Sequence, residues 1–181
     1  MREPAMQDIF QQLQDADHRC RARATELSVL NRKKSDWVGI GFRIGTTRLL
    51  SKMGEVTEIL EMPDYTRVPG AKPWVVGIAN VRGSLLPLMD VQGFVTGMNL
   101  KSRRDGRVLV VGLRGTHIGL VVNEVLGLRH FSMEEQTYEL PAIEAMLKPF
   151  IKLAFHREQE YWPVFNLQVL TEDERFLQAA K

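Results

Sequence analysis

Apolar and polar residues follow two different periods along this chain. Up to about residue 30, apolar residues recur at steps of three and four, the spacing of one face of a helix. That stripe consists of Ile9, Leu13, Ala16, Cys20, Ala24 and Leu27. From Trp37 onward the alternation has a period of two, which is typical of strands. The sequence therefore predicts an N-terminal helix followed by a body of β-strands.

Short strand patterns fill the rest of the chain. They cover residues 37–44, 48–53, 55–60, 74–81, 80–91, 107–113, 117–122, 125–131, 150–155 and 161–165. Glycine and proline separate them, and Arg114, Gly115 and Thr116 predict a hairpin turn. A short helix is expected around residues 142–147 and a closing helix over residues 167–179. Many short strands without regular intervening helices predict a mainly β fold built as small barrels or a sandwich.

Composition and charge narrow the functional classes. The chain has 181 residues, of which 44% are hydrophobic and 25% charged, as in ordinary soluble domains. Its net charge of +2, from 24 basic and 22 acidic residues, gives little reason to expect a nucleic-acid or anionic-membrane surface. The single cysteine excludes an internal disulfide. With neither a long apolar run nor an apolar signal core, the sequence predicts a cytoplasmic protein that does not insert into a membrane.

Candidate chemistry is sparse. The four histidines are scattered, at His18, His117, His130 and His156, so neither a metal site nor a cofactor site is predicted. Serine hydrolase and phosphate-loop motifs are missing. Asp90 and Glu124 stand in apolar surroundings at predicted strand ends, so each is either a general acid–base candidate or a hydrogen-bonded structural carboxylate. An enzyme that uses both therefore stays an alternative, as does a nucleic-acid-binding barrel.

One strand-like segment, residues 80–91, contains four residues that do not suit a core strand. It reads N-V-R-G-S-L-L-P-L-M-D-V. Gly83 and Pro87 are expected to shape the backbone, through a turn or bulge and an unpaired strand position. Asp90 is expected to fix the turn that follows. Arg82 is then expected to face outward, where arginine offers five donors and a planar face to a partner.

The longer stretch V-V-G-I-A-N-V-R-G-S-L-L-P-L-M-D-V, residues 75–91, resembles the core signature of the CheW-like domain family. The positions that match are Gly77, Asn80, Arg82, Gly83, Pro87 and Asp90. V-T-E-I-L at 56–60, V-P at 68–69 and G-L-V-V-N-E-V at 119–125 also resemble family elements, with Asn123 in place of the usual aspartate. The N-terminal extension, W-V-G-I-G-F-R at 37–43 and P-F-I-K-L-A-F-H-R-E at 149–158 are most similar to the adaptors of type IV pilus chemosensory systems.

This resemblance implies a fold of two five-stranded, SH3-like barrels. The expected division is an N-terminal helical extension at 1–35, a CheW-like domain at 36–171 and a C-terminal helical tail at 172–181. The implied function is a non-catalytic adaptor that joins the cytoplasmic tip of a chemoreceptor to a CheA-type histidine kinase and controls twitching motility. The kinase contact is expected on the first barrel and the receptor contact along the groove between barrels. An adaptor of a flagellar or other chemosensory array is the alternative within the family.

The expected partner-binding residues gather around the signature. They are Arg82, Glu58, Asn80, Val81, Gly83, Val75 and Leu85. Glu58 is the expected partner of Arg82 within the chain, matching a family pairing. Two interpretations of Arg82 stay open: it contacts a binding partner, or it does no more than close this internal ion pair, which contributes about 0–1 kcal/mol if exposed.

Overall fold

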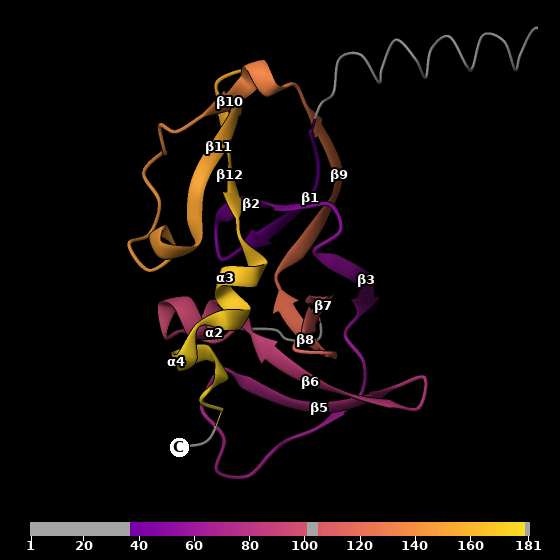
Figure 1. The fold of residues 1–181 in the computed structure, drawn as a ribbon. Coiled ribbons are helices and arrows are strands. Elements are labelled where there is room, and N and C mark those ends of the chain that lie inside the picture. The colour runs from indigo at the N-terminus through magenta and orange to yellow at the C-terminus, as the bar shows by residue number, and fades with distance from the viewer. Residues whose placement is uncertain (1–36, 101–104, 180–181) are drawn as a thin grey trace, which may run out of the picture.

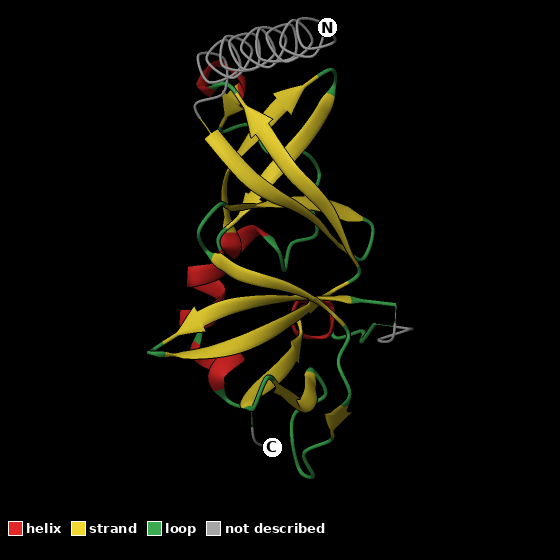
Figure 2. Ribbon diagram, turned by 90° about the vertical axis from the view of Figure 1, so that its right-hand side faces the viewer, coloured by secondary structure: helices red, strands yellow, loops and turns green. Residues whose placement is uncertain are grey.

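The computed structural model describes residues 37–100 and 105–179, and these form two six-stranded sheets stacked end to end (Figure 1; Figure 2). The first sheet has the order β10-β11-β12-β2-β1-β9, with β1 Trp37–Ile44, β2 Thr47–Lys52, β9 Glu124–Phe131, β10 Gln136–Thr137, β11 Ile151–Arg157 and β12 Glu160–Phe165. The second has the order β3-β7-β8-β6-β5-β4, with β3 Val56–Glu61, β4 Tyr65–Thr66, β5 Val75–Val81, β6 Ser84–Asp90, β7 Arg107–Leu113 and β8 Thr116–Val122. The helix expected at 1–35 lies outside the described residues.

The mainly β fold in two parts is confirmed. Each sheet has six strands where five were expected, because β4 and β10 add a two-residue strand at one edge of each. Two residues are too few to produce an alternating pattern in the sequence.

The largest hydrophobic cluster joins the two sheets. It includes Phe42 and Leu49 from the first sheet and Leu109 and Leu120 from the second, all fully buried. Phe176, from the C-terminal region, packs into the same cluster. The two parts of the fold therefore share one core, and apolar burial holds them together.

The helices depart from the sequence prediction. The closing helix is split into α3 Leu167–Glu172 and α4 Glu174–Leu177, because Asp173 is extended and its side chain accepts the N–H of Arg175 as the cap of α4. The helix expected around 142–147 is wrong: that segment ends in a turn that enters the 3-10 helix η2 Lys148–Phe150. A six-residue helix has little stability without packing to support it. The sequence also missed α2 Val91–Thr96.

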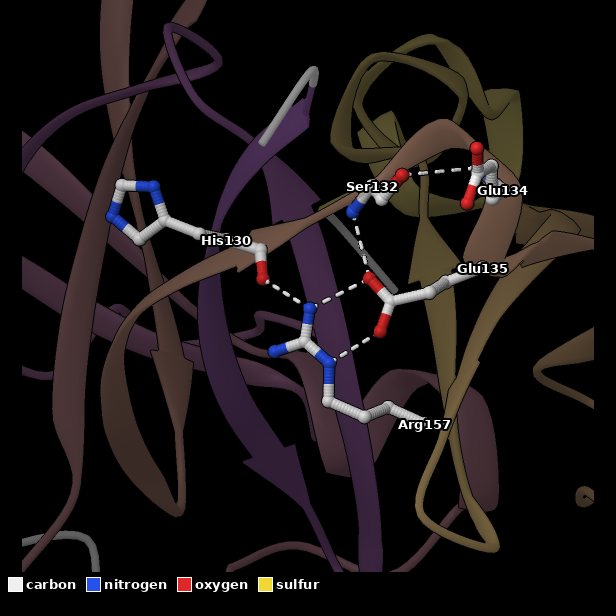
Figure 3. Close-up of polar contacts among 5 residues, drawn as sticks. All are labelled: His130, Ser132, Glu134, Glu135 and Arg157. Carbon is white, nitrogen blue, oxygen red and sulfur yellow. Dashed lines mark hydrogen bonds and ion pairs between the residues drawn. The ribbon is translucent and has the colours of Figure 1, made fainter. Parts of the chain in front are cut away.

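Arg157 on β11 forms hydrogen bonds to the end of β9 and to the segment that connects β9 to β10 (Figure 3). Its Nη2 donates to the carbonyl of His130 at 2.7 Å and to Oε2 of Glu135 at 2.6 Å, and its Nε donates to Oε1 of Glu135. Glu135 also accepts the N–H of Ser132 and completes a capping box on the 3-10 helix η1 Met133–Glu135. Nε and Nη2 of the guanidinium thus both act in holding the first sheet together.

This contact makes the stability of the fold depend on pH. The hydrogen bond from Arg157 holds the pKa of Glu135 below its ordinary value of 4.5. A carboxyl group with a lowered pKa in the folded state stabilises the protein above the unfolded pKa, and that stability is lost as the pH falls through the folded value. Glu135→Gln should therefore lower the free energy of unfolding at pH 7 by about 1 kcal/mol, discounted for the exposure of Arg157, and by progressively less as the pH falls through the lowered pKa of Glu135.

Urea denaturation of the wild type and Glu135→Gln between pH 3 and 7 measures this difference. Glu139→Gln, on an exposed side chain in the same region, is the control and should leave the pH profile unchanged. A constant difference across the pH range would contradict the assignment.

Gly77 of the signature lies where no side chain fits. Its φ is +153°, and a Cβ built there would lie 2.3 Å from the backbone oxygen of Thr66 on the paired strand β4. We expect Gly77→Ala to destabilise the protein by about 2–4 kcal/mol, because either the backbone or β4 must shift. Gly112→Ala is the matched control, since a Cβ there meets nothing within 4 Å, and it should change stability by less than about 0.5 kcal/mol. Equal effects of the two substitutions in chemical denaturation would contradict this reading.

Candidate functional site

The signature forms the β5–β6 hairpin, whose turn is Arg82-Gly83. Both turn residues have positive φ, +50° and +83°, as a type I′ turn requires, and Val81 pairs with Ser84 across it. Oδ1 of Asn80 accepts the N–H of Gly83 at 2.9 Å. Gly83 adopts the positive φ that the turn needs, the Asn80 side chain stabilises the turn by a hydrogen bond, and Arg82 lies at the tip of the hairpin.

Arg82 reaches across to Glu58 on β3. Its Nη2 lies 2.7 Å from Oε1 of Glu58, so the structure contains the ion pair expected from the sequence. The Arg82 side chain is 77% exposed and that of Glu58 34% exposed. Unlike Arg157, Arg82 therefore keeps most of its guanidinium in contact with solvent, where it can donate further hydrogen bonds.

A groove of about 480 Å³ opens beneath this ion pair. Val110 and Leu86 are its buried apolar lining, and Val81 and Leu85 are the more exposed part. Leu85 is 73% exposed and adds apolar area at the edge of the groove. An apolar groove with an ion pair at its rim is suited to binding a protein segment rather than to catalysis.

A second cleft, of about 320 Å³, adjoins the first through their shared residue Thr57. It lies where Glu55, in the β2–β3 connection, meets Val111 of β7 and Gln168 of α3. Burial raises the pKa of Glu55, whose Oε2 has no hydrogen-bond partner among the described residues. The groove under Arg82 is lined by strands of the second sheet alone, whereas this cleft includes the connection from the first sheet to the second.

Val75 and Pro87 lie away from Arg82. Val75 is at the other end of β5, opposite Met89, and lines a separate apolar crevice of about 280 Å³ together with Pro87. Pro87 faces Ile78 on β5, and the pairing of β6 with β8 begins at the next residue, Leu88. The missing N–H of proline thus falls just before the β6–β8 ladder.

The two carboxylates considered for catalysis are both engaged in structural contacts. Asp90 is fully buried at the N-cap of α2: Oδ1 accepts the N–H of Gly93 and Oδ2 that of Leu100, both at 2.9 Å. Glu124 is half-exposed and pairs with Arg43 at 3.2 Å. Neither lines the groove under Arg82. The structure therefore brings together no catalytic pair from these two residues.

Two further properties of the described residues bear on function. Within residues 37–100 and 105–179, His, Cys, Asp and Glu side chains nowhere gather in a group of three that could hold a metal ion. The helices of the same residues are all too short or too polar to cross a bilayer.

Of the residues that line this groove from β3, β7 and β8, sequence reasoning predicted Glu58 alone. Thr57, Val110, Thr116 and His117 line it, and none of them stands out by residue type. The parallel pairing of β6 with β8, at Leu88–Gly119, brings distant segments of the chain together. The period of apolar residues along one strand contains no signal for such a neighbour.

Comparison with known proteins places this geometry in context. The model of the CheW-like domain matches residues 38–175. Protein PilI of Pseudomonas aeruginosa is 45% identical over 175 residues, which cover 97% of this chain and 98% of that protein. Protein FrzA of Myxococcus xanthus is 30% identical over 100 residues, 52% of this chain and 59% of that protein.

Among solved structures, the scaffolding protein TtCheW from Thermoanaerobacter tengcongensis superposes with a TM-score of 0.63. The match covers 77% of this chain and 94% of that one at 18% identity, so this likeness concerns the fold alone.

Proposed function

The chain belongs to the CheW-like domain family, and on that basis we propose that it is a non-catalytic adaptor linking a chemoreceptor to a CheA-type histidine kinase. The observation that carries this proposal is the exposed apolar groove beside Arg82, at the hairpin formed by the family signature. Such a surface offers apolar contact area and a directed cation, the two ingredients of a specific protein–protein contact.

The groove beside Arg82 is the proposed receptor side. Leu85 and Val81 supply exposed apolar area, and Arg82 supplies hydrogen-bond donors at the rim. Asn80 and Gly83 act indirectly, by fixing the turn that presents Arg82. The adjoining cleft at Glu55 extends this surface towards the first sheet. The groove and the adjoining cleft together suit a modest interface, of up to about 800 Å² per partner, that forms and dissociates during signalling.

The first sheet is the proposed kinase side, so that the two partners bind different parts of one rigid body. The core shared between the sheets supports that arrangement, because it holds both surfaces in a fixed relation. The proposed division of the chain is an extension at 1–35, the family domain at 36–171 and a tail at 172–181. The adaptor would act in the cytoplasm, at the membrane through the receptor.

Co-elution in size-exclusion chromatography tests the adaptor role. A receptor cytoplasmic tip fragment and the kinase's CheW-binding region, both from a type IV pilus chemosensory system, are mixed with and without the chain. We expect the two to co-elute when the chain is present and to separate when it is absent. Co-elution that does not depend on the chain, or binding of one partner alone, would contradict the proposal.

We further propose that the pathway controls type IV pilus twitching. The support is the 45% identity to PilI over nearly the whole length of both proteins. Expression of the chain in strains that lack either their pilus adaptor or their flagellar adaptor tests this assignment. We expect restored twitching in the first strain and no restored swimming in the second; the reverse pattern would favour an adaptor of a flagellar array.

A further inference from the structure

Two hairpins of the second sheet turn through the same dipeptide. The β7–β8 turn is Arg114-Gly115, with φ of +46° and +82°, and Leu113 pairs with Thr116 across it, as Val81 pairs with Ser84 across Arg82-Gly83. The first position of a type I′ turn favours asparagine, aspartate or glycine, whereas arginine is strained there. Strain that the turn itself does not require makes the Arg114 side chain a candidate for a role, which its surroundings must then support.

The groove lies between these two hairpins. Strands β6 and β8 pair only where Leu88–Asp90 meets Gly119–Val121, and each hairpin continues beyond this ladder to its turn. Ser84 and Leu85 line the groove from the β5–β6 hairpin, which projects to the right in Figure 1, and Thr116 and His117 line it from the other. A segment bound in the groove would therefore have an arginine-bearing hairpin on either side.

Charge indicates what kind of segment fits. Arg114 is exposed and makes no ion pair with any described residue, and Arg82 is mostly exposed despite its contact with Glu58. The groove itself is mainly apolar, so a bound segment is expected to turn apolar side chains inward. Two guanidiniums against one carboxylate favour acidic groups on the flanks of that segment.

We propose that Arg114 is a second contact residue of this docking surface, and that the partner is an acidic segment presenting carboxylates to both Arg82 and Arg114. This inference rests on the proposed function, since it gives the chemistry of the partner that binds the same groove.

The substitution Arg114→Asn separates a binding role from a structural one. Asparagine suits the left-handed conformation, so the melting temperature should rise by about 1–3 °C. The Kd for the receptor tip fragment, measured by calorimetry at low salt, should increase about threefold to tenfold. A purely structural role for Arg114 would raise stability without weakening binding. Gln159→Asn is the matched control, because Gln159 also has a positive φ, +67°, in the β11–β12 turn. This variant should be more stable than the wild type and bind the receptor fragment with unchanged affinity.

The partner side is tested with the same fragment after its acidic residues are changed to the corresponding amides. This fragment should bind the wild type more weakly, and Arg114→Asn should then make no further difference. If Arg82→Glu weakens binding and Arg114→Asn does not, the inference about Arg114 is overturned while the adaptor role stands. If neither weakens binding of the receptor fragment, the proposed function of the groove fails as well.

Discussion

Replacing Arg82 by glutamate is expected to weaken binding of the receptor tip about 10- to 100-fold while the protein stays folded. Loss of a hydrogen bond to a charged group costs about 1.5–3 kcal/mol, and each 1.4 kcal/mol is tenfold in affinity. The substitution also places two carboxylates together, at position 82 and at Glu58, where the ion pair now measures 2.7 Å. The carboxylate that loses its partner belongs to Glu58, whose side chain is 34% exposed, so no fully buried charge is left unpaired.

Arg67→Glu is the control for the change in net charge. Arg67 is exposed in the connection between β4 and β5 and does not line the groove. The Arg67→Glu variant should bind the receptor fragment with the same affinity as the wild type. Calorimetric titration, together with circular dichroism and a melting curve for each variant, separates lost binding from lost structure. If Arg82→Glu bound the receptor fragment as tightly as the wild type does, the role of Arg82 would be limited to its ion pair with Glu58.

Replacing Asp90 by alanine is expected to destabilise the fold by about 2–4 kcal/mol. The side chain is fully buried, and its two oxygens satisfy the N–H groups of Gly93 and Leu100. An N-cap is worth about 0.5–2 kcal/mol, and leaving a second buried N–H without its acceptor costs about 1–3 kcal/mol more. The melting temperature should fall by about 5–15 °C.

Asp173→Ala provides the comparison for Asp90→Ala, because Asp173 caps α4 by accepting the N–H of Arg175. Its side chain is partly exposed, so the loss should be about 1 kcal/mol. If urea denaturation gave Asp90→Ala a stability close to the wild type, the structural role of Asp90 would be contradicted.

The local shape of the signature was predictable because turn chemistry acts over a few residues. A turn or bulge was expected at Gly83, and family resemblance supplied Glu58 as the partner of Arg82. The groove itself was not predictable from periodicity, because Val110 of β7 and Thr116 and His117 of β8 join it through the parallel pairing of β6 with β8, which are distant in the sequence. Val75 was grouped with Arg82 by proximity in sequence, yet it lies at the other end of the same strand.

The helical segments were predicted less well, because each is short and is decided by one or two contacts. α2 depends on the cap from Asp90, and the break between α3 and α4 depends on Asp173. A six-residue helix has too few turns for its apolar spacing to stand out. The strands were easier to predict, because glycine and proline separate them along the chain.

We propose that the chain couples a receptor, bound at the groove beside Arg82, to a kinase bound at the first sheet. The most direct test of this proposal is kinase autophosphorylation, measured as incorporated phosphate with receptor, kinase and chain reconstituted together on vesicles. With the wild type, receptor-dependent phosphorylation should rise well above the level without the chain, and with Arg82→Glu it should fall back towards that level. Full receptor-dependent activity with Arg82→Glu, or no stimulation by the wild type, would contradict the account.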